Sequence, residues 1–226
     1  MKISENTLDF CRKLAQNNAR EWFHANKIAY QQTKNNFEEF IQEMILRIGE
    51  FENMYGVEIK HCNYRIARDV RFSADKSPYK TWLSASFSEG GRKANLMDYY
   101  LHIQPDGKSF LGGGAYAPSP QQLAQLRQEI DYNALELKSI IQKPIFKQTF
   151  GDIQGSSLKT SPKGYDKEHP EIQLIRMQQM FFMKTYTDQE VLSVDFATIL
   201  TNDCKVLKPF LDYLNVIFKE NTDKFV

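Results

Sequence analysis

The part of the chain with the most chemical potential runs from Arg65 to Lys80. It holds five basic residues and two acidic ones, so its local net charge is +3, whereas the whole chain of 226 residues has a formal net charge of +1. The basic residues are Arg65, Arg68, Arg71, Lys76 and Lys80, and the acidic ones are Asp69 and Asp75. Guanidinium groups match phosphate or carboxylate oxygens in pairs, and ammonium groups bind them as point charges. This surplus of cations predicts a pocket for a small anionic ligand, such as a phosphorylated metabolite.

Two residues elsewhere join the five cations as candidate ligand-binding residues. His102 falls on the polar side of a predicted strand and can line a groove, and Lys163 lies in a long polar loop over residues 151–170. Loops of this length without regular structure are usually functional or mobile.

Catalysis by the same stretch is a further hypothesis. Asp69 or Asp75 can act as a general base and Tyr79 as a proton donor. However, neighbouring cations lower the pKa of an aspartate, which suits a charge stabiliser or a metal ligand better than a base at neutral pH.

Two other functions are compatible with the same residues. In a structural or partner-binding module, Asp69 and Asp75 would neutralise the basic residues in an ion-pair network that locks this corner of the fold. A binder of nucleic-acid backbones is disfavoured because the chain is nearly neutral and has no basic run. The four histidines and three cysteines show no metal-ligand spacing, so no metal site is predicted, and no pattern indicates a cofactor or an oligomeric state.

The basic stretch resembles the signature of the DUF2461 family, a bacterial family of uncharacterised proteins. The signature is roughly Arg-x-x-Arg-Asp-x-Arg-Phe-Ser-x-Asp/Asn-Lys-x-Pro-Tyr-Lys, and the chain follows it from Arg65 to Lys80. Three other stretches resemble the family: residues 17–23, Gly112–Gly114 leading to Pro118, and Lys163–Tyr165 leading to His169 and Pro170. The resemblance covers nearly the whole chain and implies no activity, cofactor or catalytic residue.

Composition indicates one globular domain over residues 1–226, because 42% of the residues are hydrophobic and 13% are aromatic. No apolar run approaches the roughly 20 residues that a membrane-spanning helix needs. Met1 to Phe10 lacks the apolar core of a signal peptide. The three cysteines are far apart, which suits reduced thiols. We therefore expect a cytoplasmic protein without a membrane segment.

Hydrophobic periodicity predicts an α+β fold, with an antiparallel sheet of hairpin-linked strands covered by a long N-terminal helix and by C-terminal helices. The predicted strands cover one or two runs within residues 57–72, then residues 81–88, 99–104, 108–115, 146–150 and 181–186. The predicted helices cover residues 4–16, a run of nearly 30 residues ending at Gly49, then residues 119–130, 131–142 and 171–180, and the region from Thr187 to about Phe218 with a kink or new start at Pro209.

Three details of this scheme bear on function. Asn18, with Glu21 three residues later, is expected to cap the long helix. In a strand, Arg68 would lie in an otherwise apolar row and would need a carboxylate, several carbonyls or a bound anion as partner. Gly112–Gly114, just before a predicted helix, can bind phosphate through backbone amides or allow close packing, and we favour packing.

Overall fold

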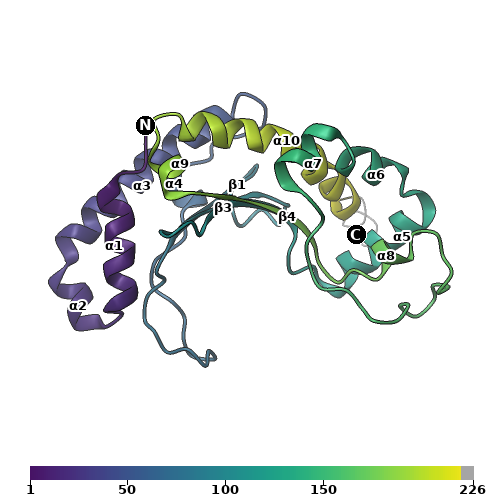
Figure 1. The fold of residues 1–226 in the computed structure, drawn as a ribbon, viewed down its shortest axis with the longest axis horizontal. Helices are drawn as coiled ribbons and strands as arrows, with labels where there is room; N and C mark the ends of the chain where they lie inside the picture. The colour runs from purple at the N-terminus through teal and green to yellow at the C-terminus, as the bar shows by residue number, and fades with distance from the viewer. Residues whose placement is uncertain (220–226) are drawn as a thin grey trace. The chain divides into compact units, whose positions relative to one another are not determined.

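The computed structural model describes residues 1–219 and confirms the α+β class. Four strands form one antiparallel sheet in the order β1-β2-β3-β4: Leu83–Phe87, Tyr99–Ile103, Ser109–Ala115 and Met180–Tyr186 (Figure 1). The described helices are α1 (Glu5–Gln16), α2 (Arg20–Ala25), α3 (Lys27–Ile48), α4 (Ile59–Cys62), α5 (Pro120–Asn133), α6 (Leu135–Ile141), α7 (Pro144–Phe150), α8 (Ile172–Ile175), α9 (Asp188–Leu192) and α10 (Phe196–Lys219).

The chain divides into two compact units. Unit 1 comprises residues 1–111 and 185–202, and unit 2 comprises residues 112–184 and the chain from Asp203 onward. The expectation of a single domain over residues 1–226 stays a prediction.

In unit 1, the two faces of the β1–β2 hairpin differ in character. β1 and β2 pair with Leu83 opposite Ile103, and Leu83, Ala85 and Leu101 belong to the buried core. Helix α3 packs against β1, and α1 packs against α3. Because neighbouring side chains on a strand point to opposite faces, the other face carries the polar residues of both strands. Its cross-strand pairs are Ser84 with His102 and Ser86 with Tyr100.

The N-terminal helices agree with prediction at α1 and differ beyond it. Ser4 caps α1 by accepting a hydrogen bond from the Thr7 amide, and Thr7 is buried. The predicted helix of nearly 30 residues is wrong, because the helix is interrupted at Asn26, where α2 ends and α3 begins. The capping role of Asn18 is also wrong: α2 follows Ala19 without a side-chain cap. The Asn18 side-chain amide instead donates to the Tyr79 carbonyl and accepts from the Tyr79 amide.

Residues 57–72 do not form the predicted strands. They contain α4 and then a loop that extends away from the sheet and returns at β1 (Figure 1). Backbone pairing in the loop is limited to two isolated bridges, Asn63 with Ala85 and Ala67 with Tyr79. The apolar row that was expected on either side of Arg68 does not form one buried face, because Phe72 at its end is 96% exposed. Alternation specifies a strand only where one face of it is buried.

Unit 2 has an aromatic core between β4 and α10. The rings of Phe182 and Phe210 meet edge to face with centroids 5.0 Å apart, and Phe146 packs edge to face against both. Phe146 belongs to α7, so the predicted strand over residues 146–150 is wrong. Pro144 at the first helical turn is the local signal for a helix here, because proline there presets the backbone and sacrifices no hydrogen bond.

Three further features of unit 2 correct or refine the prediction. The helix expected over residues 171–180 is confined to the single turn of α8. Pro209 lies inside α10, which continues past it. Gly114 has φ +123°, and a Cβ atom there would lie 2.6 Å from the Met180 carbonyl oxygen of β4. This close approach supports packing over phosphate binding at the glycine-rich stretch.

Candidate functional site

The loop between α4 and β1 is closed at its base by backbone hydrogen bonds. The Arg68 amide donates to the Pro78 carbonyl at 2.9 Å, and the Lys80 amide donates to the Ile66 carbonyl at 2.8 Å. We call residues 68–78 the loop tip. The base therefore fixes where Lys80 leaves the loop, independently of the tip's side chains.

The basic side chains of the tip bond within the tip. Arg68 pairs with Asp75, and Arg71 pairs with Asp69 through Nη2–Oδ2 and Nε–Oδ1 contacts of 2.7 and 3.0 Å. Lys76 donates to two backbone carbonyls of the tip at 3.0 and 3.5 Å. Arg71, Asp69, Asp75 and Lys76 are all exposed. These contacts link the ends of the tip to each other and leave its cations already engaged.

The three catalytic candidates from the sequence are engaged as well. The Ser77 side chain and amide, with Arg68, hold the pKa of Asp75 well below its usual range. Arg71 lowers the pKa of Asp69. The Tyr79 ring stacks on Phe23 with centroids 4.0 Å apart. Two carboxylates that stay ionised suit charge pairing better than proton abstraction near neutral pH.

A second group of cations lies where the loop meets the sheet. We call Arg65, Lys80 and Arg92 the basic cluster. Burial lowers the pKa of Lys80, and the charges of Arg65 and Arg92 lower it further. None of the three forms an ion pair with any carboxylate of residues 1–219. Positive charge is therefore concentrated here without an ion pair, although the Asp69 carboxylate lies near Arg65 and the Asp98 carboxyl group lies near Tyr64.

Tyr64 contacts two members of the basic cluster. Its ring is 5.2 Å from the Lys80 ammonium and 5.5 Å from the Arg92 guanidinium carbon, distances typical of cation–π contacts. Arg92 is also held by the Lys60 carbonyl, to which it donates at 2.8 Å. The Tyr64 hydroxyl lies 3.1 Å from the Ser86 hydroxyl of β1. The cluster is thereby attached to the polar face of the sheet.

His102 occupies the middle of that polar face. Its ring stacks between Trp82 and Phe110, with centroid distances of 5.2 and 4.6 Å. Nε2 lies 2.8 Å from the Gln104 amide oxygen, and Nδ1 lies 3.5 Å from the Tyr100 hydroxyl. Burial lowers the pKa of His102, and the nearby Lys80 charge adds to this effect. The imidazole is therefore neutral at physiological pH and is held in one orientation.

Two buried polar groups beside His102 lack partners. The Trp82 indole N–H and the Ser84 hydroxyl make no hydrogen bond within the described part of the chain. Burial raises the pKa of Tyr100, and the nearby Ser84 hydroxyl and Trp82 N–H oppose this effect in part. Neither group makes a hydrogen bond of normal geometry with Tyr100. A buried polar group without a partner is costly, so these groups are available to a bound molecule or water.

Asp98 supplies the carboxyl group of this face. Burial raises its pKa to about 6, and the Ser86 hydroxyl and the Asp98 amide only partly oppose the effect. Burial raises the pKa of Tyr64 and of Tyr100, and the Asp98 charge raises both further. A carboxyl group with this pKa can exchange a proton near neutral pH, which the aspartates of the loop tip cannot do.

The structure brings together only part of the sequence-predicted site. Arg65, Lys80 and His102 meet around the polar face, whereas Arg68, Arg71 and Lys76 lie in the loop tip. Lys163 belongs to unit 2, where it is exposed.

Sequence reasoning missed five residues of this arrangement: Tyr64, Trp82, Arg92, Asp98 and Tyr100. A signal for several of them was present. Asp98, Tyr100 and His102 alternate along β2 and the residue before it, and Trp82, Ser84 and Ser86 alternate along β1, so each set shares a face. Arg92 has no such signal, because it approaches Tyr64 from the turn after β1.

Other chemistries find little support in the described residues. Burial raises the pKa of the Cys62 thiol and of the Cys11 thiol to about 12, which makes both poor nucleophiles. Residues 1–219 contain no group of three or more histidine, cysteine, aspartate or glutamate side chains that could hold a metal ion. Within the same residues, no helix has the length and apolar character that crossing a bilayer requires.

Comparison with known proteins gives one match. The model of a family described as conserved hypothetical protein (DUF2461) matches residues 6–213. No curated protein and no solved structure matches the chain. The matched region contains the loop, the basic cluster and the polar face of the sheet. The chain belongs to the DUF2461 family.

Proposed function

We propose that unit 1 binds a small anionic ligand, such as a phosphate monoester, at the basic cluster. The observation that carries this proposal is the position of Lys80 and Arg92 against one Tyr64 ring, with Arg65 close to Lys80. The charges of Arg65 and Arg92 lower the pKa of Lys80, and no carboxylate of residues 1–219 pairs with any of them. An anion among these groups would remove the repulsion and accept several charge-assisted hydrogen bonds.

The neighbouring face of the sheet suits the rest of such a ligand. Tyr64, Trp82 and Tyr100 offer aromatic surface, and the Trp82 N–H and Ser84 hydroxyl offer hydrogen bonds that the protein leaves unmade. Ligand sites commonly combine aromatic walls with a few placed polar groups. In this proposal the loop tip takes no part in binding, because its cations pair within the tip and the backbone bonds at the base position Lys80.

The pKa of Asp98 favours a second candidate, an enzyme that acts on the same ligand. With a pKa of about 6, Asp98 can accept or donate a proton at neutral pH. Ser86 and Tyr64 connect it to the basic cluster. Asp98 would then be the acid–base group, and the basic cluster would stabilise negative charge on the substrate.

Titration calorimetry of the full chain with phenyl phosphate and with inorganic phosphate tests the binding proposal. Lys80→Gln and Arg92→Gln should each weaken binding about tenfold or more, because each removes a charge-assisted hydrogen bond. Arg71→Gln is the matched control: it removes an exposed cation of the same loop and should leave affinity unchanged.

Three results would contradict the proposal. The protein could bind neither phosphate compound at low ionic strength. Arg71→Gln could weaken binding as much as Lys80→Gln, which would place the anion at the loop tip. Finally, a single-stranded oligonucleotide could bind far more tightly, with affinity falling steeply as salt is added, which would indicate a nucleic-acid binder.

A further inference from the structure

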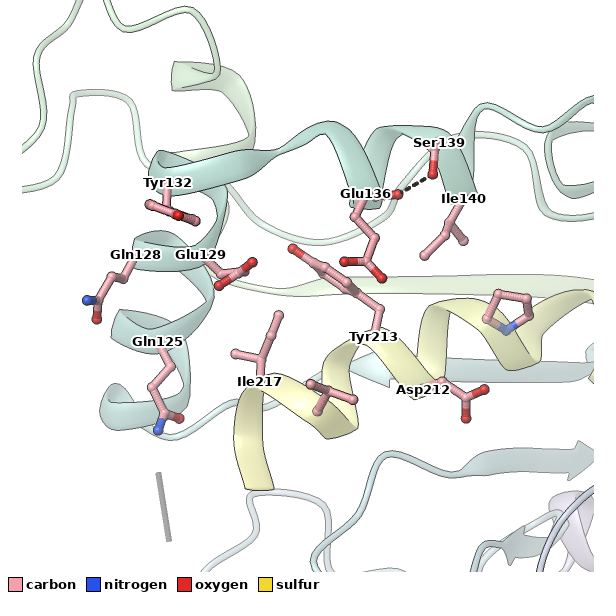
Figure 2. A pocket seen from close by; sticks show the side chains of 12 residues that line it. Gln125, Gln128, Glu129, Tyr132, Glu136, Ser139, Ile140, Asp212, Tyr213 and Ile217 are labelled. Carbon is pink, nitrogen blue, oxygen red and sulfur yellow. Dashed lines mark hydrogen bonds between the residues drawn. The ribbon is translucent and has the colours of Figure 1, made fainter. Parts of the chain in front are cut away.

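Unit 2 contains a separate cavity with the opposite electrostatic character. It has a volume of about 620 Å³ and lies between the α5–α6 region and the C-terminal half of α10 (Figure 2). This volume is within the range of small-molecule sites, roughly 300–1,000 Å³. The cavity is therefore large enough for a metabolite-sized ligand.

The charged lining of this cavity is acidic. Glu129, Glu136 and Asp212 line it, and no lysine or arginine is among its described lining residues. Asp212 is already paired with Lys208, at 3.1 Å. The carboxylates of Glu129 and Glu136 have no ion-pair or hydrogen-bond partner among residues 1–219. Two negative charges therefore face the cavity without compensation.

Tyr213 provides a second, independent sign of a missing ligand. The residue is only 5% exposed, yet its hydroxyl has no hydrogen-bond partner in the described part of the chain. Figure 2 shows this hydroxyl directed toward the space between the side chains of Glu129 and Glu136. Burial raises the pKa of Tyr213, and both glutamates raise it further, so the phenol stays neutral. Leaving such a group unpaired costs free energy that a bound partner would recover.

We propose that this cavity binds a small organic cation, with an ammonium group held by Glu129, Glu136 and the Tyr213 hydroxyl. An ammonium has three N–H donors, which matches two carboxylates and one hydroxyl oxygen. Ile140 and Ile217 also line the cavity and offer apolar surface for the hydrocarbon chain of an aliphatic amine. A metal ion fits less well, because the described residues include no group of three or more carboxylate, histidine or thiolate ligands suited to one.

The full chain titrated with diaminobutane, followed by calorimetry at low ionic strength, tests this site. Saturable binding is expected. Glu129→Gln and Glu136→Gln should each weaken it about tenfold, since each removes a charged acceptor, and Tyr213→Phe should weaken it about fivefold. Butanol, which lacks the positive charge, should not bind. Titration with an Nα-acetyl-lysine amide, compared with diaminobutane, shows whether the ammonium group belongs to a lysine side chain or to a free amine.

Matched controls separate this site from general electrostatics. Glu168→Gln neutralises an exposed carboxylate of unit 2 outside the cavity, and Tyr116→Phe removes an exposed hydroxyl, so both should retain full affinity. The thermal midpoint of Tyr213→Phe should equal or exceed that of the wild type, because an unpaired hydroxyl is removed. The proposal is wrong if diaminobutane does not bind, if butanol binds equally well, or if Glu168→Gln weakens binding as much as Glu129→Gln. It is also wrong if Tyr213→Phe leaves affinity unchanged.

Discussion

Asp98 makes the stability of unit 1 depend on pH in a direction opposite to that of most carboxyl groups. Burial raises its pKa from 3.8 to about 6 in the folded protein. Between these values the folded state binds more protons than the unfolded state, so stability falls as pH rises from about 4 to about 6 and stays low above that range. The difference of about 2 between the pKa values corresponds to about 3 kcal/mol.

Asp98→Asn removes the charge while keeping the size and an acceptor oxygen for Ser86. We therefore expect the variant to be more stable than the wild type at pH 8, by up to about 3 kcal/mol, and to lose most of that advantage at about pH 4. Urea unfolding followed by circular dichroism across this pH range measures the difference. Because each pH compares two proteins that differ at one residue, the titration of His102 cancels.

Glu39→Gln is the control for this experiment, since it neutralises an exposed carboxyl group of α3 and should give a small difference that is constant with pH. The argument fails if the difference between Asp98→Asn and the wild type does not vary with pH. It also fails if the variant is less stable at pH 8, which would mean that the charged carboxylate is well solvated or paired in the folded state.

Two substitutions test packing elsewhere. Asn18→Ala should lower the free energy of unfolding by about 1–3 kcal/mol, because the Asn18 side-chain amide makes two hydrogen bonds of 2.9 and 3.2 Å with the Tyr79 backbone. Urea unfolding and amide hydrogen exchange at Tyr79 measure the change, and unchanged stability and exchange would show that those bonds are not maintained. Gly114→Ala should lower the free energy of unfolding by more than about 2 kcal/mol, since the new Cβ atom would meet the Met180 backbone. Gly107→Ala, with φ +70° and open space around it, should lower it by about 1 kcal/mol through backbone strain alone. Equal thermal midpoints for the two variants would contradict the contact at Gly114.

The sequence predicts elements well where the determining interactions are local. The capping boxes that the sequence indicates at Ser119 and at Thr187 are both present in the structure, because a cap is decided by residues within one turn. Strands β1 to β3 follow from alternation and from the turn at residues 105–107. Phe146 was misassigned because a short apolar run fits either a helix or a strand.

The candidate site could be predicted only in part, because its properties depend on contacts between distant segments. The cations of the signature are visible in the sequence, but their division into an internally paired tip and an unpaired base is set by the loop's backbone. The pKa of Asp98 reflects burial by residues far along the chain, which no local pattern encodes. The polar row of Ser84, Ser86, Tyr100 and His102 was visible as alternation, yet a polar face of a sheet usually faces solvent.

The backbone bonds at residues 66–68 and 78–80 have a consequence for how the loop can change. These bonds close the base of the loop. The segment beyond them is held by ion pairs among its own residues. Replacing it with a short turn should therefore keep the stem and its attachment to the sheet intact, because the two backbone hydrogen bonds of the stem do not involve the tip's side chains. The stem can thus tolerate the loss of the family's signature residues in the tip, even though the two are neighbours in the chain.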